Sequence, residues 1–508
     1  MKKNIFSLSL MLCALLLFVQ GGLAKEKENT ASEKRGSMFK SNGTPSAALL
    51  NINKIAAWYE SNGEMERNPS DGNSGLTYPR GTATAIYASG LVWGGRVIDG
   101  KIPVIRVGGS DYNRGVAPGA ILGIQTGKYE DPNALDVRLW RIRRDYATAD
   151  LRQDAAETNT KSLGSVTDGD IAVVRKQYET DWKEWPWEKG APYYDKNNNG
   201  IYDPKPLPGK INDVEVPDTS SDSPGIADAD QVIWFVCHDL TGPSQWASPQ
   251  IGLEQQTTIW GYNRSDALGN VIFKKFKLIY KGTATTPPDG RIEDMYLCQW
   301  SDPDLGDAGD DFAGCDTTLS VGFVYNSKTL DKTYRPFNIA PPASGYDFLQ
   351  GPIVPAPGKT AVFDLKYKPD WKNLPMTSFI YFAAGGKYGD PPHTAAGAIQ
   401  WYQMLRGLPP TPQGPPDPAP EVDPKTLQPT SFWLPGDPVT DPKAEKSWVD
   451  GLWDTPGDRR IMLTSGPFTM KLGETQELVS ATLCGLGSDS LTSISVFKFY
   501  DRAVQSAY

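Results

Sequence analysis

Apolar residues occur along most of the chain in short segments separated by Gly, Pro and Asp, a pattern that predicts β-strands. Residues 270–280 alternate between apolar and polar positions, as expected for a strand with one solvated face. Residues 231–236 and 257–262 predict buried strands. Further strands are expected at 81–107, with a turn at Asp99-Gly100, and at 135–146, 294–300, 318–325, 360–365, 378–382, 460–463, 468–470 and 476–483.

Three segments have helical spacing instead. Within residues 171–187, Val174, Tyr178 and Trp182 recur every four residues, which would give one face of a helix an apolar stripe. Residues 393–406 predict a second helix, ended by Gly407-Leu-Pro-Pro, and residues 491–507 a third. The expected fold class is mainly β: a multidomain β-sandwich of immunoglobulin or fibronectin type with a few short helices.

Changes in composition divide the chain into parts. We expect a signal peptide at 1–24, a flexible N-terminal arm at 25–45, a β-rich domain at 46–160, a Trp-rich segment with a calcium-like loop at 161–255, a β-sandwich domain with an acidic loop at 256–407, a Pro-rich linker or draped loop at 408–458, and C-terminal strands completing an immunoglobulin-like sandwich at 459–508.

The N-terminal residues have the features of an export signal. Lys2 and Lys3 precede a mostly apolar stretch at 5–19, and Gly22-Leu23-Ala24 offers small residues for cleavage. We therefore expect a secreted protein, extracellular or on the outer cell surface, and no later apolar run is long enough to span a bilayer. Without Lys2 and Lys3, 51 basic residues become 49 against 60 acidic ones, a net charge of −11 that disfavours nucleic acid as a partner.

Four cysteines remain after the signal, and their pairing is open. Cys237, Cys298, Cys315 and Cys484 are disulfide candidates in an exported chain, with three alternative connectivities. The alternative is that they are buried free thiols, an interpretation favoured by the apolar surroundings of Cys237 and Cys484.

Residues 195–203 resemble the first part of an EF-hand calcium loop. Asp195, Asn197 and Asn199 occupy loop positions one, three and five, Gly200 gives the turn, the Ile201 carbonyl falls at seven and Asp203 at nine. Pro206 stands where a bidentate Glu normally closes the shell, so Asp213 or Glu215 would have to supply the closing carboxylate. The alternative is an Asn-rich turn without metal.

The run from Ser301 to Asp316 is a second cation candidate. It places six carboxylates in a short Gly-rich segment, and no basic residue occurs between Arg291 and Lys328. Like charges held this close repel unless they are hydrated or neutralised, and oxygen ligands without histidine suit Ca²⁺. The expected ligands are Asp302, Asp304, Asp307, Asp310 and Asp311.

Two further functions remain as alternatives. Trp182, Trp185 and Trp187 could form a stacking platform for a glycan, although tryptophans more often anchor a core. A polysaccharide hydrolase would need two facing carboxyls, for which Glu254, Glu293 and Asp294 are the suspects. We assign no catalytic residue.

Several blocks of sequence resemble a family of large exported surface proteins from Bacteroidetes- and Ignavibacteria-type bacteria, described as type IX secretion-associated or hypothetical. The matching blocks are Thr84-Ala-Ile-Tyr-Ala-Ser-Gly-Leu-Val-Trp-Gly-Gly95, Gln255-Gln-Thr-Thr-Ile-Trp-Gly-Tyr-Asn-Arg-Ser-Asp-Ala-Leu-Gly-Asn270, Trp300-Ser-Asp-Pro-Asp-Leu-Gly-Asp-Ala-Gly-Asp-Asp311, Pro435-Gly-Asp-Pro-Val-Thr440 and Pro456-Gly-Asp-Arg-Arg-Ile-Met-Leu-Thr-Ser-Gly-Pro-Phe-Thr469. The resemblance implies a surface location and a β-rich architecture, with no established reaction. Such proteins commonly continue into a C-terminal sorting module, which is not recognisable here before Tyr508.

The expected function is a structural or adhesive protein, secreted or on the cell surface, stabilised by Ca²⁺ and self-assembling into an extracellular polymer. Its expected partners are copies of itself, other surface proteins or glycans. A carbohydrate-binding surface protein and a polysaccharide hydrolase are the alternatives.

Overall fold

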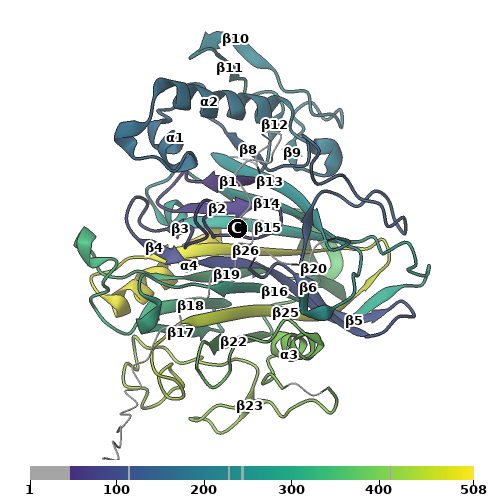
Figure 1. Ribbon diagram of the computed structural model, residues 1–508, viewed down its shortest axis with the longest axis vertical. Coiled ribbons are helices and arrows are strands. Elements are labelled where there is room, and N and C mark those ends of the chain that lie inside the picture. The colour runs from purple at the N-terminus through teal and green to yellow at the C-terminus, as the bar shows by residue number, and fades with distance from the viewer. Residues whose placement is uncertain (1–45, 113–114, 227–228, 242–244, 412–413) are drawn as a thin grey trace, which may run out of the picture. The chain divides into compact units, whose positions relative to one another are not determined.

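A computed structural model describes residues 46–112, 115–226, 229–241, 245–411 and 414–508 (Figure 1). The signal peptide and arm predicted at 1–24 and 25–45 lie outside the described residues. The described chain is mainly β, with several antiparallel sheets and a few helices, which confirms the expected mainly-β, sandwich-like class. In the described part of the chain, no helix is both long and apolar enough to cross a membrane.

The largest sheet has nine strands and lies at the centre of the fold. In spatial order its strands are β17 (Asp311–Asp316), β18 (Val321–Asn326), β19 (Ala343–Gln350), β26 (Thr475–Gly485), β15 (Val271–Tyr280), β14 (Leu253–Gly261), β13 (Gln231–His238) and β7 (Ala117–Pro118), with β8 (Trp140–Arg143) also paired to β13. Both faces are covered, which explains why β13 and β14 are buried at every position.

A five-stranded sheet packs against one face of the nine-stranded sheet. Its order is β22 (Ser378–Ala383), β25 (Arg459–Lys471), β16 (Arg291–Asp302), β5 (Ala88–Ile98) and β6 (Ile105–Gly109). The core between the sheets contains Ile233 and Phe276 from the larger sheet and Leu297 from the smaller one. Polar contacts also cross this space, because the Ser480 hydroxyl donates to Gln299 Oε1 at 3.1 Å. The two sheets form the sandwich that the strand pattern predicted.

Smaller sheets complete the β-structure. A four-stranded sheet follows the order β1 (Ala47–Leu50), β2 (Ala56–Glu60), β3 (Leu76–Thr77) and β4 (Thr84–Ile86). The two-stranded ribbons are β9 (Tyr193–Tyr194) with β12 (Ser223–Pro224), β10 (Pro206–Ile211) with β11 (Val214–Pro217), β20 (Ile353–Phe363) with β21 (Lys366–Asn373), and β23 (Glu421–Val422) with β24 (Pro429–Thr430).

Helices cover the outer faces of both large sheets. The α-helices are α1 (Arg152–Thr158), α2 (Asp168–Lys183), α3 (Ala395–Leu405) and α4 (Ser490–Ala507), and the short 3₁₀ helices are η1 (Leu163–Ser165), η2 (Trp187–Lys189), η3 (Gln245–Ala247), η4 (Ala267–Asn270), η5 (Ala308–Asp310) and η6 (Arg335–Phe337). Figure 1 shows α1 and α2 at one end of the stacked strands and α3 at the other. The helices predicted at 171–187, 393–406 and 491–507 are α2, α3 and α4.

Capping explains where two of these helices begin. Thr167 and Asp170 form a capping box at the start of α2, and Asp489 and Thr492 form one at the start of α4. Tyr178 of α2 and Phe497 of α4 then pack into a second core on the outer face of the nine-stranded sheet. The helices are therefore held by both their local sequence and their packing.

The predicted domain boundaries do not separate units in the described chain. The described residues all belong to one compact unit. The nine-stranded sheet takes β8 from the segment 46–160, β13 from 161–255, β15 from 256–407 and β26 from 459–508. Antiparallel partners can be distant in the chain, and composition does not report which strands pair. The C-terminal pair β25 and β26 contributes one strand to each large sheet, so this segment does complete the sandwich.

Candidate metal site

The candidate site forms where β16 ends. Asp302 is the last residue of β16, is paired across the sheet with Ala88 of β5, and is fully buried. The Tyr112 hydroxyl donates a hydrogen bond to Asp302 Oδ2 at 2.6 Å. The Tyr112 ring also lies edge-on to Trp300, with 4.8 Å between the ring centroids. A strand end and an aromatic contact therefore hold this carboxylate in place.

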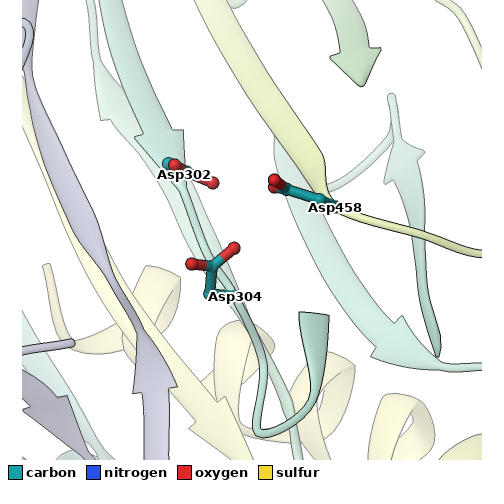
Figure 2. Close-up of side chains that lie close together, drawn as sticks. All are labelled: Asp302, Asp304 and Asp458. Atoms are coloured by element: carbon teal, nitrogen blue, oxygen red, sulfur yellow. The ribbon is translucent and has the colours of Figure 1, made fainter. Parts of the chain in front are cut away.

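Two further carboxylates converge on Asp302. Asp304 follows two residues later in a left-handed backbone conformation, and Asp458 directly precedes β25. One carboxylate oxygen from each of the three residues lies within 4.8 Å of the others (Figure 2). In the described part of the chain, no other group of three or more Asp, Glu, His or Cys side chains meets this closely.

Arg460 lies against the same carboxylates. Its guanidinium is 3.0 Å from Asp458 Oδ2, 3.6 Å from Asp302 Oδ1 and 3.5 Å from Asp390 Oδ1. Burial alone would lower the pKa of Arg460, but Asp302, Tyr112 and the neighbouring acids raise it. One guanidinium therefore faces three of these acids, and Asp304 lies beside two of them.

The neighbouring carboxylates also act on Asp311. It is fully buried, and its Oδ2 accepts a hydrogen bond from the Leu305 N–H at 2.9 Å. Burial raises the pKa of Asp311 well above its usual range, and the carboxylates of Asp304, Asp310 and Asp458 raise it further. A bound cation would oppose this shift by favouring the ionised carboxylate.

The remaining acids of the run have lysine partners. Asp307 lies 2.8 Å from Lys332, and Asp310 lies 3.3 Å from Lys328. Asp316 is 3.0 Å from Lys498 on α4. The positive charge missing from the run itself is therefore supplied in part from elsewhere in the chain. Of the five expected ligands, the structure brings Asp302 and Asp304 together, and it places Asp307 and Asp310 in ion pairs.

The loop at 195–203 forms a mostly exposed turn, anchored by the buried Tyr202 side chain. Asp195 accepts hydrogen bonds from the N–H groups of Asn199 and Gly200 at 3.1 and 2.7 Å. The Asn199 side chain accepts from the Ile201 N–H at 2.8 Å, and the Asn197 amide donates to Asp203 Oδ1 at 3.0 Å. These contacts are compatible with a calcium loop and equally with an Asn-rich turn.

The carboxylate that reaches this loop is Asp222 rather than Asp213 or Glu215. Asp222 is buried and accepts from the N–H groups of Lys196 and Asp203 at 2.9 and 3.1 Å, so it holds both ends of the loop. Glu215 instead pairs with Lys183 at 2.8 Å, and Asp213 lies between β10 and β11. The sequence prediction failed here because Asp222 is outside the spacing of the loop motif.

The tryptophan cluster does not present three open rings. Trp182 and Trp185 are buried in the core beneath α2, while Trp187 is half-buried and edge-on to Tyr193 at 5.7 Å. A sugar ring needs an exposed indole face to stack on, so Trp182 and Trp185 cannot form the expected platform. They anchor the helix instead.

The cysteines are free thiols in this structure, which contradicts the disulfide expectation. Cys237, Cys298, Cys315 and Cys484 are all buried and unpaired, and all four belong to the core between the sheets. Burial raises the pKa of Cys298 to about 12. The alternative of buried, unreactive thiols is therefore the one observed.

The hydrolase suspects are engaged in separate contacts. Glu254 pairs with Lys281 at 2.6 Å and accepts from the Ile121 N–H at 2.7 Å. Glu293 lies 2.7 Å from Arg291, and Asp294 lies 3.6 Å from Arg96. Each carboxylate thus has a structural contact of its own, and none of these contacts joins two of the suspects across a groove.

Sequence reasoning missed Asp458, Arg460, Tyr112 and Asp390 as parts of the acidic cluster. Asp458 lies within block 456–469, one of the blocks that carry the family resemblance, but nothing in the sequence around it indicates proximity to Asp302. Comparison with protein-family models finds no family that matches the chain, and comparison with curated proteins finds no match either.

Proposed function

We propose that the protein is a structural or adhesive component, secreted or on the outer cell surface, whose fold is stabilised by Ca²⁺. The observation that carries the proposal is the convergence of Asp302, Asp304 and Asp458. The export-type N-terminal sequence and the resemblance to exported Bacteroidetes- and Ignavibacteria-type surface proteins support the location.

Calcium is the cation that suits these groups best. The cluster offers carboxylate oxygens, part of it is accessible to water, and an ion there would need no histidine or thiolate. Asp302 ends β16 and Asp458 precedes β25, two neighbouring strands of the five-stranded sheet. An ion shared by these residues would tie together segments that are far apart in the chain, and so stabilise the folded state.

Self-assembly belongs to the same proposal and rests on the ribbon of β20 and β21. These strands pair with each other and form a separate two-stranded sheet. Tyr367 is 85% exposed on this ribbon, and Leu365 at its turn is also exposed. Exposed strand edges with apolar side chains favour contact with another chain. Light scattering and negative-stain microscopy of the mature protein test this, and a monomer under all calcium and salt conditions contradicts it.

Thermal unfolding tests the calcium proposal. Adding Ca²⁺ at about 100 times its dissociation constant to EDTA-treated protein should raise the midpoint by roughly 3 °C, since a ligand that binds only the folded state stabilises it. Asp458→Asn should abolish this shift, whereas Asp289→Asn, an exposed control, should keep it. An unchanged midpoint in the wild-type protein contradicts calcium binding. A shift lost in Asp195→Asn but kept in Asp458→Asn would move the ion to the other loop.

An aromatic cavity favours carbohydrate binding as a second candidate. The cavity has a volume of about 310 Å³, and its lining includes Trp260, Tyr262, Phe273, Tyr367 and Tyr508. Aromatic side chains are common in the walls of small-ligand sites. A glycan array on the wild-type protein and on Tyr367→Ala, with Trp187→Ala as a control outside the cavity, tests this candidate. Hits that survive Tyr367→Ala would exclude the cavity as their site.

A further inference from the structure

A lysine and a glutamate meet inside the sandwich, away from the acidic cluster. Lys274 lies on β15 with its side chain directed between the two large sheets, as its neighbours Ile272 and Phe276 are. Its Nζ is 3.0 Å from Glu66 Oε1, and both side chains are completely buried. The Glu66 backbone is fixed on both sides, since its N–H donates to Trp58 and its carbonyl accepts from Gly75.

Hydrogen bonding around this pair is unequal. Glu66 accepts from Lys274, from the Tyr346 hydroxyl at 2.6 Å to Oε2, and from the Thr482 hydroxyl at 3.0 Å to Oε1. Among the described residues, Lys274 Nζ donates one hydrogen bond, to Glu66, and otherwise faces the Tyr346 ring at 4.5 Å from its centroid. An ammonium group has three N–H donors, and leaving buried donors without acceptors is costly. An amide nitrogen has one N–H instead of three, so fewer buried donors would lack acceptors.

We propose that Lys274 and Glu66 condense to form an amide cross-link inside the protein. The bond joins Lys274 Nζ to the side-chain carboxyl carbon of Glu66, and one water molecule leaves. The inference is independent of the proposed function, because it uses none of the residues of the acidic cluster or the 195–203 loop.

The surroundings supply what this condensation requires. Burial lowers the pKa of Lys274, and the Glu66 carboxylate only partly offsets this, which favours the neutral amine. In the first step of the condensation, the ammonium proton moves from Nζ to Oε1 along their hydrogen bond. Both groups are then uncharged, which a medium of low dielectric constant favours. The neutral amine has a lone pair available for attack on the carboxyl carbon.

The remaining steps balance with these groups alone. As the N–C bond forms, the electron pair of the carbonyl moves to Oε2, where the Tyr346 hydroxyl stabilises the developing charge. A second proton then moves from the nitrogen to the protonated Oε1. The C–Oε1 bond breaks, water departs, and the carbonyl re-forms at Oε2. No oxidant, metal or other reactant is needed.

The cross-link would join distant parts of the sheets. Glu66 and Lys274 are 208 positions apart, and the bond would tie the segment after β2 to the middle of the nine-stranded sheet. Such a bond limits the freedom of the unfolded chain as a disulfide does. The amide would supply a covalent restraint that the four free cysteines do not provide.

Peptide mapping of the wild-type protein is the decisive test. Trypsin should release a branched species in which residues 55–67 are joined to residues 265–275, because cross-linked Lys274 is no longer a cleavage site. Its mass should be that of the two peptides less one water molecule, and fragmentation should place the bond at Glu66 and Lys274. Recovery of two unlinked peptides from folded, mature protein overturns the proposal, as does a loss of water that maps to other residues.

Variants separate the cross-link from an ordinary ion pair. Lys274→Met and Glu66→Ala should each remove the branched peptide completely and restore the full intact mass. Lys275→Met changes the adjacent lysine, which pairs with Asp364 at 2.8 Å, and should retain the loss of one water. A loss of water that persists in Lys274→Met contradicts the assignment. If either variant fails to fold, the wild-type peptide map still decides the question.

Discussion

The two acidic segments of this chain have similar compositions and different structural roles. The loop at 195–203 is mostly exposed, and its Asp and Asn side chains mostly bond to the backbone of the same loop. The run at 301–316 begins at a buried strand end, and its carboxylates reach β25, α4 and the segment after β18. An acidic, Gly-rich sequence can therefore be a local turn or a junction between distant elements, depending on what packs around it.

This difference predicts different consequences of mutation. Carboxylates in the run at 301–316 have partners that are far away in the chain, so removing a partner should affect global unfolding. Mutations in the loop at 195–203 should affect only the local unfolding of that loop.

Arg460→Met should have the largest effect. The substitution removes a guanidinium that lies against buried and partly buried carboxylates, and removing one member of a buried ion pair typically costs about 3–5 kcal/mol. Urea unfolding with and without Ca²⁺ measures this loss, and Ca²⁺ should recover more stability in the variant than in the wild type. Arg264→Met, which breaks an exposed pair with Asp266, should change stability by less than about 1 kcal/mol. Equal losses of unfolding free energy in Arg460→Met and Arg264→Met would contradict the interpretation of the run at 301–316 as a junction between distant elements.

Asp501→Asn should have an intermediate effect that depends on pH. Asp501 on α4 faces Asp347 of β19. Burial is the main cause that raises the pKa of Asp501 to about 6. Asp316, at the end of the acidic run, also raises the pKa of Asp501, whereas the interaction with Asp347 and the charge of Arg502 lower it. The folded state therefore holds this proton more tightly than the unfolded state does. The resulting stability is present below about pH 4 and is lost as the pH rises through about 6.

An amide at this position cannot ionise, so the variant should lose less stability than the wild type between about pH 4 and 7, by on the order of 2 kcal/mol. Unfolding free energies measured across this range test the prediction. Asp289→Asn, on the surface, should follow the wild-type profile. If the unfolding free energies of Asp501→Asn and the wild type changed in parallel with pH, Asp501 would not titrate as proposed.

Asp195→Asn should have the smallest effect on global stability, within about 0.5 kcal/mol, because the hydrogen bonds of this carboxylate are exposed and stay within the loop. Hydrogen exchange should instead become faster at the amides of Asn199 and Gly200, which donate to this carboxylate. Asp218→Asn, an exposed turn carboxylate that accepts from the Ser220 N–H, provides the matched control and should leave those amides unchanged. A large fall in the global unfolding free energy would mean that the two acidic segments do not differ as described.

Much of the local structure could be predicted from short-range patterns. Strands such as β13, β15 and β26 and helices α2, α3 and α4 follow from alternation, helical spacing and turn residues. The order of the strands in the sheets could not be predicted in this way, because it depends on packing between distant parts of the chain. For example, β26 lies between β19 and β15. The free cysteines illustrate the same limit, since their spacing carries no information about which side chains meet.

Only part of the candidate site could be predicted from the sequence. Asp302 and Asp304 were expected as ligands because they are close in sequence, carboxylate-bearing and in a Gly-rich segment. Asp458 and Arg460 were not expected, because their approach depends on the pairing of β16 with β25. Asp307 and Asp310, also expected as ligands, form ion pairs with Lys332 and Lys328 instead.

The sequence by itself determined the positions of most strands and helices, the predominance of β-structure and the acidic character of the two loops. These properties depend on neighbours within a few residues, where periodicity and turn chemistry act. The tertiary structure decided which carboxylates converge, which cysteines remain free and that Lys274 meets Glu66. Those contacts join distant residues through the packing of two sheets, and only the folded chain brings such residues into contact.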